Sequence, residues 1–170
     1  LLSFDDGYSS FYTRVLAVLR AYNWHALLAP VGTWIDTPSN QPVDFAGTPR
    51  ARSDFLTWEQ VREISRSGLV EIAAHTDANH KGILANPQGN LQPAAATRRY
   101  DPLTKRYESE ADFQARIRTD VSNISEKIRK ATGYKPRVWV WPYGAADGTS
   151  LTVVGEEGYE MALTLDDGLD

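Results

Sequence analysis

The sequence predicts an α/β fold in which parallel strands alternate with helices. Strand-like and helix-like segments alternate five times along the chain, which indicates repeated strand–helix–strand units. Acidic, imidazole and phenol side chains follow several strand-like runs, where parallel α/β folds gather their chemistry. The 170 residues allow one sizeable core and therefore one domain. An open doubly wound sheet and an incomplete barrel both fit this order, because a full eight-stranded barrel usually takes ~250 residues.

The first half of the chain supplies two helices. An apolar run at residues 2–4 predicts the first strand, and a helix over residues 10–22 follows, where apolar residues recur at three- and four-residue spacing. The apolar run 26–31 predicts a buried strand, whereas the Pro-, Asn-, Asp- and Gly-rich residues 32–54 predict a long loop. The Thr-x-x-Gln spacing of a capping box begins a second helix over residues 57–67, which a glycine stops.

The second half repeats the alternation. Residues 69–74 predict a strand, and the polar, Pro- and Gly-bearing residues 86–108 predict a second long loop. Apolar residues at helical spacing over residues 113–128 mark the longest helix, which ends near Gly133. A strand, a weaker helix and a final strand are expected at residues 137–141, 150–157 and 161–165.

Composition excludes several function classes. The formal net charge of −4 argues against nucleic acid as a partner, since nucleic-acid binding needs a basic face. No apolar run approaches the ~18 residues of a transmembrane segment. The absence of cysteine excludes disulfides and thiolate ligands but leaves the compartment open. Because Leu1 begins inside a strand-like run and an acidic tail follows the last one, the chain is expected to be a fragment of a longer protein, lacking its N- and C-terminal parts.

Two adjacent carboxylates, Asp5 and Asp6, end the first strand. Neighbouring carboxylates repel and are costly to desolvate, so the pair indicates a metal or another cationic partner. Capping of the following helix explains one of them, with a gain of about 0.3–1 kcal/mol, but not both. One acid is therefore expected to ligate a metal while the other accepts a proton. The Asp-x-Asp nucleophile motif of phosphate-transfer hydrolases is disfavoured, because the two acids here are adjacent.

The imidazoles of His75 and His80 follow another predicted strand. Five residues apart, the two side chains diverge on either a helix or a strand, and they converge only across a turn. With Asp6 they would form a two-histidine, one-carboxylate metal site with positions left for water and substrate. His25 leads into a buried strand without such neighbours, so a structural role is expected.

The segment Trp141-Pro142-Tyr143-Gly144 forms a rigid turn after a strand, where a backbone N–H could face a developing oxyanion. Arg137 precedes it, and alternation predicts that at least one of the tryptophans at positions 139 and 141 is a core residue. A second Asp-Asp-Gly at residues 166–168 resembles the first, but no helix follows it.

Together these motifs resemble the polysaccharide deacetylases (carbohydrate esterase family 4, NodB homology). The resemblance rests on Phe4-Asp5-Asp6-Gly7, the paired histidines, and Arg137 with residues 141–144. Most of that family has three residues between the histidines, whereas this chain has four, followed by Lys-Gly-Ile and a long insertion that includes residues 92–99. That combination is similar to the poly-β-1,6-N-acetyl-D-glucosamine N-deacetylases of biofilm export, the PgaB type. The resemblance runs through nearly the whole chain, so residues 1–170 are read as one deacetylase domain.

The resemblance implies a distorted, incomplete (β/α) barrel of the NodB-homology type, with parallel strands and outer helices. It implies a metal-dependent hydrolase that cleaves the acetyl amide bond of N-acetylglucosamine residues, located in the cell envelope, periplasmic or outer-membrane-associated. Asp5 would be the catalytic base, Arg137 would orient it, and the Tyr143 N–H would help form the oxyanion hole. The divalent metal, which could be zinc, nickel, cobalt or iron, would be held by Asp6, His75 and His80.

Other expectations concern the substrate and the proton donor. Trp34, Trp141 and Leu165 are further candidates for contact with the acetylated glucosamine polysaccharide, and other domains of the same longer protein are further possible partners. In the biofilm branch the general acid is a histidine from a motif before the acidic pair, so it is expected upstream of Leu1.

Two alternatives remain. Chitin or peptidoglycan could be the deacetylated polymer. The chain could instead be a non-catalytic, metal-dependent glycan-binding module, with Trp34, Tyr100 and Tyr107 as stacking surfaces. Asp5 discriminates between enzyme and module, because a binding module needs metal ligands but no spare base beside them.

Overall fold

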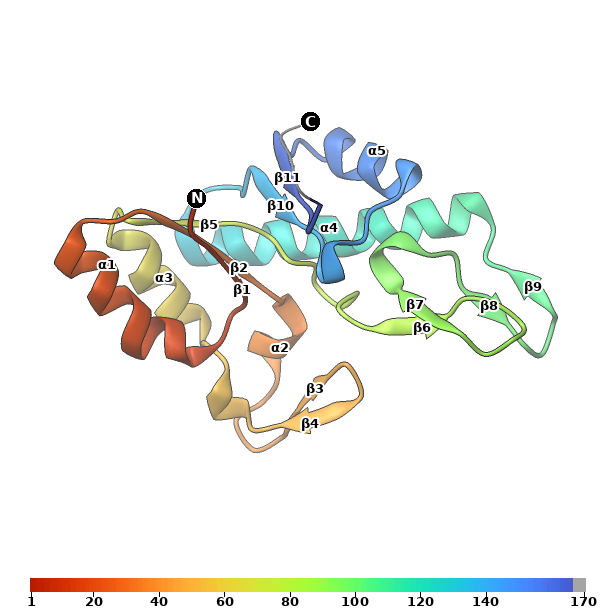
Figure 1. The fold of residues 1–170 in the computed structure, drawn as a ribbon, viewed down its shortest axis with the longest axis horizontal. Helices are drawn as coiled ribbons and strands as arrows, with labels where there is room; N and C mark the ends of the chain where they lie inside the picture. The colour runs from red at the N-terminus through yellow and green to blue at the C-terminus, as the bar shows by residue number, and fades with distance from the viewer. Residues whose placement is uncertain (167–170) are drawn as a thin grey trace.

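Five short parallel strands form the centre of the fold. The computed structural model describes residues 1–166 (Figure 1). β1 (Ser3–Asp6) pairs with β2 (Ala26–Pro30), which pairs with β5 (Val70–Ile72). β10 (Val138–Val140) pairs with β11 (Met161–Leu163). All of these pairings are parallel, as the alternation of strands and helices predicts.

The two groups of strands join just beyond β5. Ala74 forms a parallel bridge with Trp139. Its N–H donates to the Val138 carbonyl at 3.0 Å, and its carbonyl accepts from the Val140 N–H at 2.8 Å. The order across the centre is therefore β1-β2-β5-β10-β11, with the carboxyl ends of the strands at one rim. Side chains that follow these strands gather at that rim.

Helices connect the strands, and local signals set most of their ends. The first helix begins with wide, π-type turns at Phe11–Val15 and continues as α1 (Leu16–Tyr22). It is followed along the chain by α3 (Trp58–Arg66), the long α4 (Glu110–Thr132) and α5 (Gly148–Glu156). A capping box begins α3 and α5, and a residue in the left-handed conformation follows α1 and α4. The predicted helices are confirmed within a few residues at each end.

Both segments predicted as long loops carry regular structure. Residues 32–54 hold the short helix α2 (Gly32–Asp36) and a hairpin of β3 (Val43–Phe45) and β4 (Thr48–Arg50). Two more hairpins pair β6 (Gly82–Leu84) with β7 (Leu91–Pro93), and β8 (Tyr100–Asp101) with β9 (Arg106–Tyr107). Single turns of 3₁₀ helix occur at Arg52–Asp54, Ala94–Ala96 and Pro142–Gly144. The loop prediction is wrong at the strands within residues 32–54 and 86–108, because two or three residues are too few for a repeating apolar pattern.

The core covers both faces of the strands. On one face Leu28 and Ile72 pack with helix residues such as Ile64 in the main cluster. On the other face Leu27 and Ala29 belong to a smaller cluster with side chains from β10. Burial on both faces is typical of parallel sheets and explains the almost continuous apolar run of β2. Within residues 1–166 no helix has the length and apolar character to cross a membrane.

Several elements outside the central strands lie at the two ends of the molecule and along its lower edge in Figure 1. Figure 1 shows α1 beside α3 at one end of the molecule and the hairpins β6–β7 and β8–β9 at the other. The Tyr12 hydroxyl donates to Glu63, which ties the first helix to α3. The β3–β4 hairpin lies at the lower edge of this view, below α2.

Candidate metal and active site

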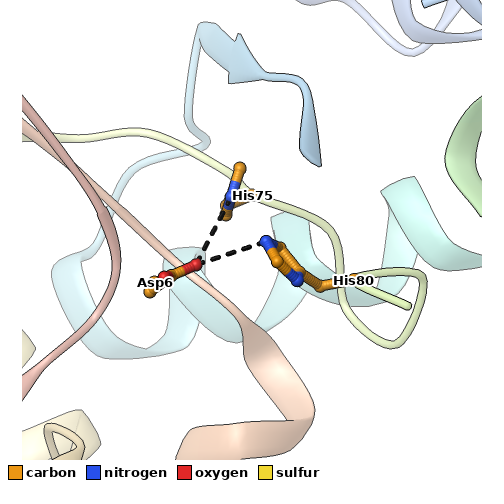
Figure 2. A group of neighbouring side chains, drawn as sticks. All are labelled: Asp6, His75 and His80. Atoms are coloured by element: carbon orange, nitrogen blue, oxygen red, sulfur yellow. Dashed lines mark ion pairs between the residues drawn. The ribbon is translucent and has the colours of Figure 1, made fainter. Parts of the chain in front are cut away.

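Asp6, His75 and His80 converge at the carboxyl ends of β1 and β5 (Figure 2). The Nε2 atoms of His75 and His80 lie 3.6 Å and 3.3 Å from Oδ1 of Asp6. One potential ligand atom from each residue lies within 4.8 Å of the others. The two histidines reach the same point across the turn between them, as their spacing in the sequence predicts.

The end of β1 turns sharply at Asp6 and Gly7. Their φ angles are 69° and 75°, in the left-handed region. A side chain at Gly7 would bring its Cβ to 3.0 Å from the Pro30 Cβ, so glycine allows β2 to approach closely. The turn also interrupts the alternation of a strand, and Asp5 and Asp6 both line the same cavity.

The hydrogen bond between His75 and the Val140 carbonyl leaves two acceptor atoms, His75 Nε2 and Asp6 Oδ1, facing each other in the cluster. The Nδ1 atom of His75 lies 2.8 Å from the Val140 carbonyl, which can only accept, so Nδ1 carries the proton. Its Nε2 lone pair is then directed toward Oδ1 of Asp6. This oxygen is buried and has no hydrogen-bond partner among residues 1–166. Two acceptors at this distance need a proton or a cation between them, which fits a metal site.

Burial keeps both imidazoles neutral at physiological pH. It lowers the pKa of His75 to about 4, and burial together with the neighbouring His75 lowers the pKa of His80 to about 4. Burial, followed by repulsion from Asp5, raises the pKa of Asp6 to about 6. Neutral imidazole is the form that ligates a metal, and a nearby cation would favour the carboxylate of Asp6.

A cavity of about 350 Å³ opens beside the cluster. The β3–β4 hairpin and the ends of β1, β10 and β11 line it. Asp5 contributes an exposed carboxylate to the lining, and partial burial raises its pKa above the usual range. The cavity therefore offers space for a small polar group next to an acid that is not part of the Asp6 cluster.

The turn at residues 141–144 also lines the cavity. Tyr143 has φ 58°, and its half-exposed ring lies 4.6 Å from the His80 ring. A Cβ on Gly144 would lie 2.7 Å from atoms of Leu165, so only glycine allows this close approach. Tyr143 and Leu165 thus line the cavity together.

Trp34 and Trp141, two candidates for substrate contact, are both buried and so do not present exposed rings for a sugar to stack on. Trp34 is 5% exposed and packs 4.8 Å from the His80 ring, with Phe45 and Phe55 around it. Trp34 therefore packs against the His80 imidazole, and its exposed area is too small for a sugar to stack on it. Trp141 is 2% exposed and packs against Trp139 in the main core, although part of it reaches the cavity.

Arg137 lies away from the cavity, and its expected contact with Asp5 is not formed. Its guanidinium pairs with Glu71 at 2.8 Å and with Glu160 at 3.7 Å. Arg137 directly precedes β10, so it lies at the amino end of a parallel strand, whereas Asp5 lies near the carboxyl end of β1. The structure therefore corrects the prediction that Arg137 orients Asp5.

Other predicted residues also lie outside the cavity. His25 borders a hollow with Leu1 and Glu71 at the amino ends of the strands. Tyr100 is buried against Tyr107, with the ring centroids 5.2 Å apart, on the β8–β9 hairpin. Of the second Asp-Asp-Gly, Asp166 is exposed, and residues 167 and 168 lie outside the described residues.

Three residues of the site and its surroundings were not identified from the sequence. Phe45 and Ala46 of the β3–β4 hairpin line the cavity, but nothing in residues 32–54 marked a hairpin. Asp120 of α4 bonds the turn between the histidines. Its signal was present, since a carboxylate interrupts the apolar positions Ile117, Val121 and Ile124 of the longest helix.

Comparison with known proteins supplies a family match over almost the whole chain. A family model described as polysaccharide deacetylase matches residues 1–168. A poly-β-1,6-N-acetyl-D-glucosamine N-deacetylase of Escherichia coli K12 is 46% identical over 169 residues. That match covers 99% of this chain and 25% of the Escherichia coli protein, so the chain spans a quarter of that relative.

Solved structures agree closely with the fold. The BpsB deacetylase domain from Bordetella bronchiseptica matches with a TM-score of 0.94 and 44% identity, over 98% of this chain and 64% of that one. A de-N-acetylase from Aggregatibacter actinomycetemcomitans matches with a TM-score of 0.92 and 42% identity, over 96% of this chain and 62% of that one. The arrangement of parallel strands and helices is therefore shared with deacetylase domains.

Proposed function

Because the chain belongs to the polysaccharide deacetylase family, we propose that it removes acetyl groups from N-acetylglucosamine residues of poly-β-1,6-N-acetyl-D-glucosamine. The similarity to a relative named for that reaction supports this choice of substrate. One observation carries the proposal: two neutral imidazoles face a buried carboxylate oxygen that has no hydrogen-bond partner among residues 1–166, beside a second acid in a cavity.

Asp6, His75 and His80 would hold a divalent cation such as zinc, nickel, cobalt or iron. Two imidazoles and one carboxylate suit such ions and leave positions for water and substrate. When bound, the cation supplies Lewis-acid chemistry that activates water and polarises a carbonyl.

Asp5 is the proposed general base, because its carboxylate is exposed to the cavity beside the ligand Asp6. It would accept a proton from the attacking water as the tetrahedral centre forms at the acetyl carbon. The backbone N–H of Tyr143 is the proposed donor to the oxyanion. The departing amine would then take a proton from a general acid. His25 is not placed to be that acid, because it lies at the amino end of β2 and does not reach the cavity.

We further propose that the five strands belong to a distorted, incomplete (β/α) barrel. Residues 1–170 would be the deacetylase domain of a longer protein of the cell envelope, periplasmic or outer-membrane-associated. The match to a quarter of the Escherichia coli relative supports this view. Its partners would be the acetylated polysaccharide and other domains of the same protein.

Two other readings make different predictions. A chitin or peptidoglycan deacetylase would use the same residues on a β-1,4-linked polymer. A glycan-binding module would keep the three ligands but would not need Asp5, so the presence of that acid favours an enzyme.

Acetate release tests the proposal. Protein that includes the residues upstream of Leu1, where the general acid is expected, is loaded with metal and incubated with N-acetylglucosamine oligomers that are linked either β-1,6 or β-1,4. We expect faster acetate release from the β-1,6 oligomers. Faster release from the β-1,4 oligomers would point to chitin or peptidoglycan, and binding of oligomers without any acetate release would point to the binding module.

A further inference from the structure

Three of the four residues between His75 and His80 are buried, and Ala78 is exposed. Thr76, Asp77 and Asn79 are between 1% and 6% exposed. Thr76 also has φ 71°, a left-handed conformation that a β-branched residue rarely adopts. A buried turn in this conformation needs partners for its backbone groups and contacts that hold it in place.

A single carboxylate on α4 accepts hydrogen bonds from two backbone N–H groups of the turn. Oδ2 of Asp120 lies 2.9 Å from the Asp77 nitrogen, and Oδ1 lies 2.7 Å from the Ala78 nitrogen. The Asp120 side chain is itself buried, at 6% exposure. Both carboxylate oxygens of Asp120 therefore accept hydrogen bonds from the turn. These bonds connect α4 to residues that lie 43 and 42 positions earlier in the chain.

The beginning of α2 binds the opposite side of the turn. The Gly32 N–H donates to the Thr76 carbonyl at 3.2 Å, and the Thr33 N–H and hydroxyl donate to the Asp77 carbonyl at 2.9 Å and 2.8 Å. Lys127 of α4 pairs with the Asp77 side chain and with Asp36 of α2. The turn is thus fixed between two helices that contribute no metal ligand themselves.

We propose that Asp120 is a positioning residue for the metal site. By accepting the N–H groups of Asp77 and Ala78, it holds the turn in the arrangement that brings both imidazoles to Asp6. The inference rests on the proposed metal site and adds a residue that lies outside the cavity. Groups that orient metal ligands typically change metal affinity by about 10- to 100-fold when they are replaced.

The test uses metal-free protein and the zinc ion alone as the probe. In Asp120→Asn the side chain keeps its shape, but its NH₂ group faces one of the two N–H donors. Glu126→Gln is the matched control, because it makes the same chemical change on α4 at a half-exposed side chain that pairs with Arg129 and not with the turn. The zinc dissociation constant of each protein is measured by competition with a chromophoric chelator, and cooperative thermal unfolding without zinc shows that each variant is folded.

We expect Asp120→Asn to bind zinc about 10- to 100-fold more weakly than the parent. We expect Glu126→Gln to bind like the parent. Equal zinc affinity of folded Asp120→Asn and parent would overturn the positioning role while leaving the metal site intact. Failure of the parent to bind zinc would overturn the metal site and this inference together.

A measurement on the parent keeps the inference testable if Asp120→Asn does not fold. Hydrogen exchange of the Asp77 and Ala78 amides is followed by NMR in metal-free protein. Strong protection, comparable to that of amides in the middle of α4, is expected if Asp120 holds the turn before metal binds. Exchange as fast as in an exposed loop would contradict the inference.

Discussion

Asp5 and Asp6 are neighbours in the chain but have different surroundings in the cavity. Asp6 lies among two imidazoles, with one oxygen buried, whereas Asp5 is exposed to the space where a substrate would enter. Burial raises the pKa of both carboxyls, and repulsion from Asp5 adds to the rise for Asp6. This difference in surroundings supports separate roles as ligand and base.

Replacement of Asp5 separates these roles. Asp5→Asn removes the proposed proton acceptor but leaves the three proposed ligand side chains in place. We expect acetate release to fall by about 10²- to 10⁴-fold, the usual contribution of a general base, while zinc affinity stays close to that of the parent. Asp54→Asn, a change at an exposed acid outside the cavity lining, is the control. Loss of zinc affinity in proportion to the loss of turnover would make Asp5 a ligand instead.

Asp120 gives a second prediction, for stability. Burial raises its pKa from 3.8 to about 6, so the folded protein holds this proton more tightly than the unfolded chain. The contribution of Asp120 to stability is therefore full at low pH and is lost as pH rises from about 4 to 6, by on the order of 3 kcal/mol.

Urea unfolding of the metal-free parent and of Asp120→Asn across this pH range measures the effect. The free energy of unfolding of the parent should fall relative to the variant as pH rises. A difference that is independent of pH would show that Asp120 has an ordinary pKa in the folded protein.

At the scale of elements, helices were easier to predict than the hairpins. Thr57 and Gln60 form the predicted capping box at α3, because its signals lie within four consecutive residues. The β3–β4 hairpin has three residues in each strand and is held by distant aromatic contacts, such as Phe45 against Trp34. Its sequence contains no repeating pattern, so only the folded chain reveals it.

The same limit applies to the turn between the histidines. Sequence spacing predicted that His75 and His80 meet across a turn, since neither helix nor strand brings them together. The partners of that turn come from α2 and α4, which are far away in the chain. The apolar stripe of α4 predicted a helix. The presence of Asp120 within that stripe did not show which groups its carboxylate binds.

Gly32 gives a prediction for the contact between α2 and this turn. A Cβ at Gly32 would lie 2.0 Å from Oδ1 of Asp77, so Gly32→Ala must displace the Asp77 carboxylate from its pairing with Lys127, or move the turn or α2. We expect a loss of about 1–3 kcal/mol in the free energy of unfolding, together with weaker zinc binding. Urea unfolding and chelator competition measure these two effects.

Gly155→Ala is the matched change, because a Cβ at this α5 position meets no atom within 4 Å. It should raise the free energy of unfolding by about 1 kcal/mol and leave zinc binding unchanged. Equal behaviour of the two variants would mean that the close approach of Gly32 to Asp77 has no energetic consequence.

At the scale of the whole molecule, strand polarity explains which predicted residues meet. Residues that follow strands, such as Asp6, His75 and Tyr143, come together at the carboxyl rim. Arg137 precedes a strand and therefore lies at the other rim, near Glu71. The alternation of elements predicted the parallel sheet and its rim, whereas a motif match alone misplaced Arg137.

X-ray absorption at the zinc edge, recorded on protein loaded with one equivalent of zinc, tests the site formed by Asp6, His75 and His80 most directly. We predict two imidazole nitrogens and oxygen ligands at about 2.0–2.2 Å, and loss of one imidazole in His80→Ala. A zinc shell with fewer than two imidazoles, or a spectrum that His80→Ala leaves unchanged, would contradict the proposed metal site.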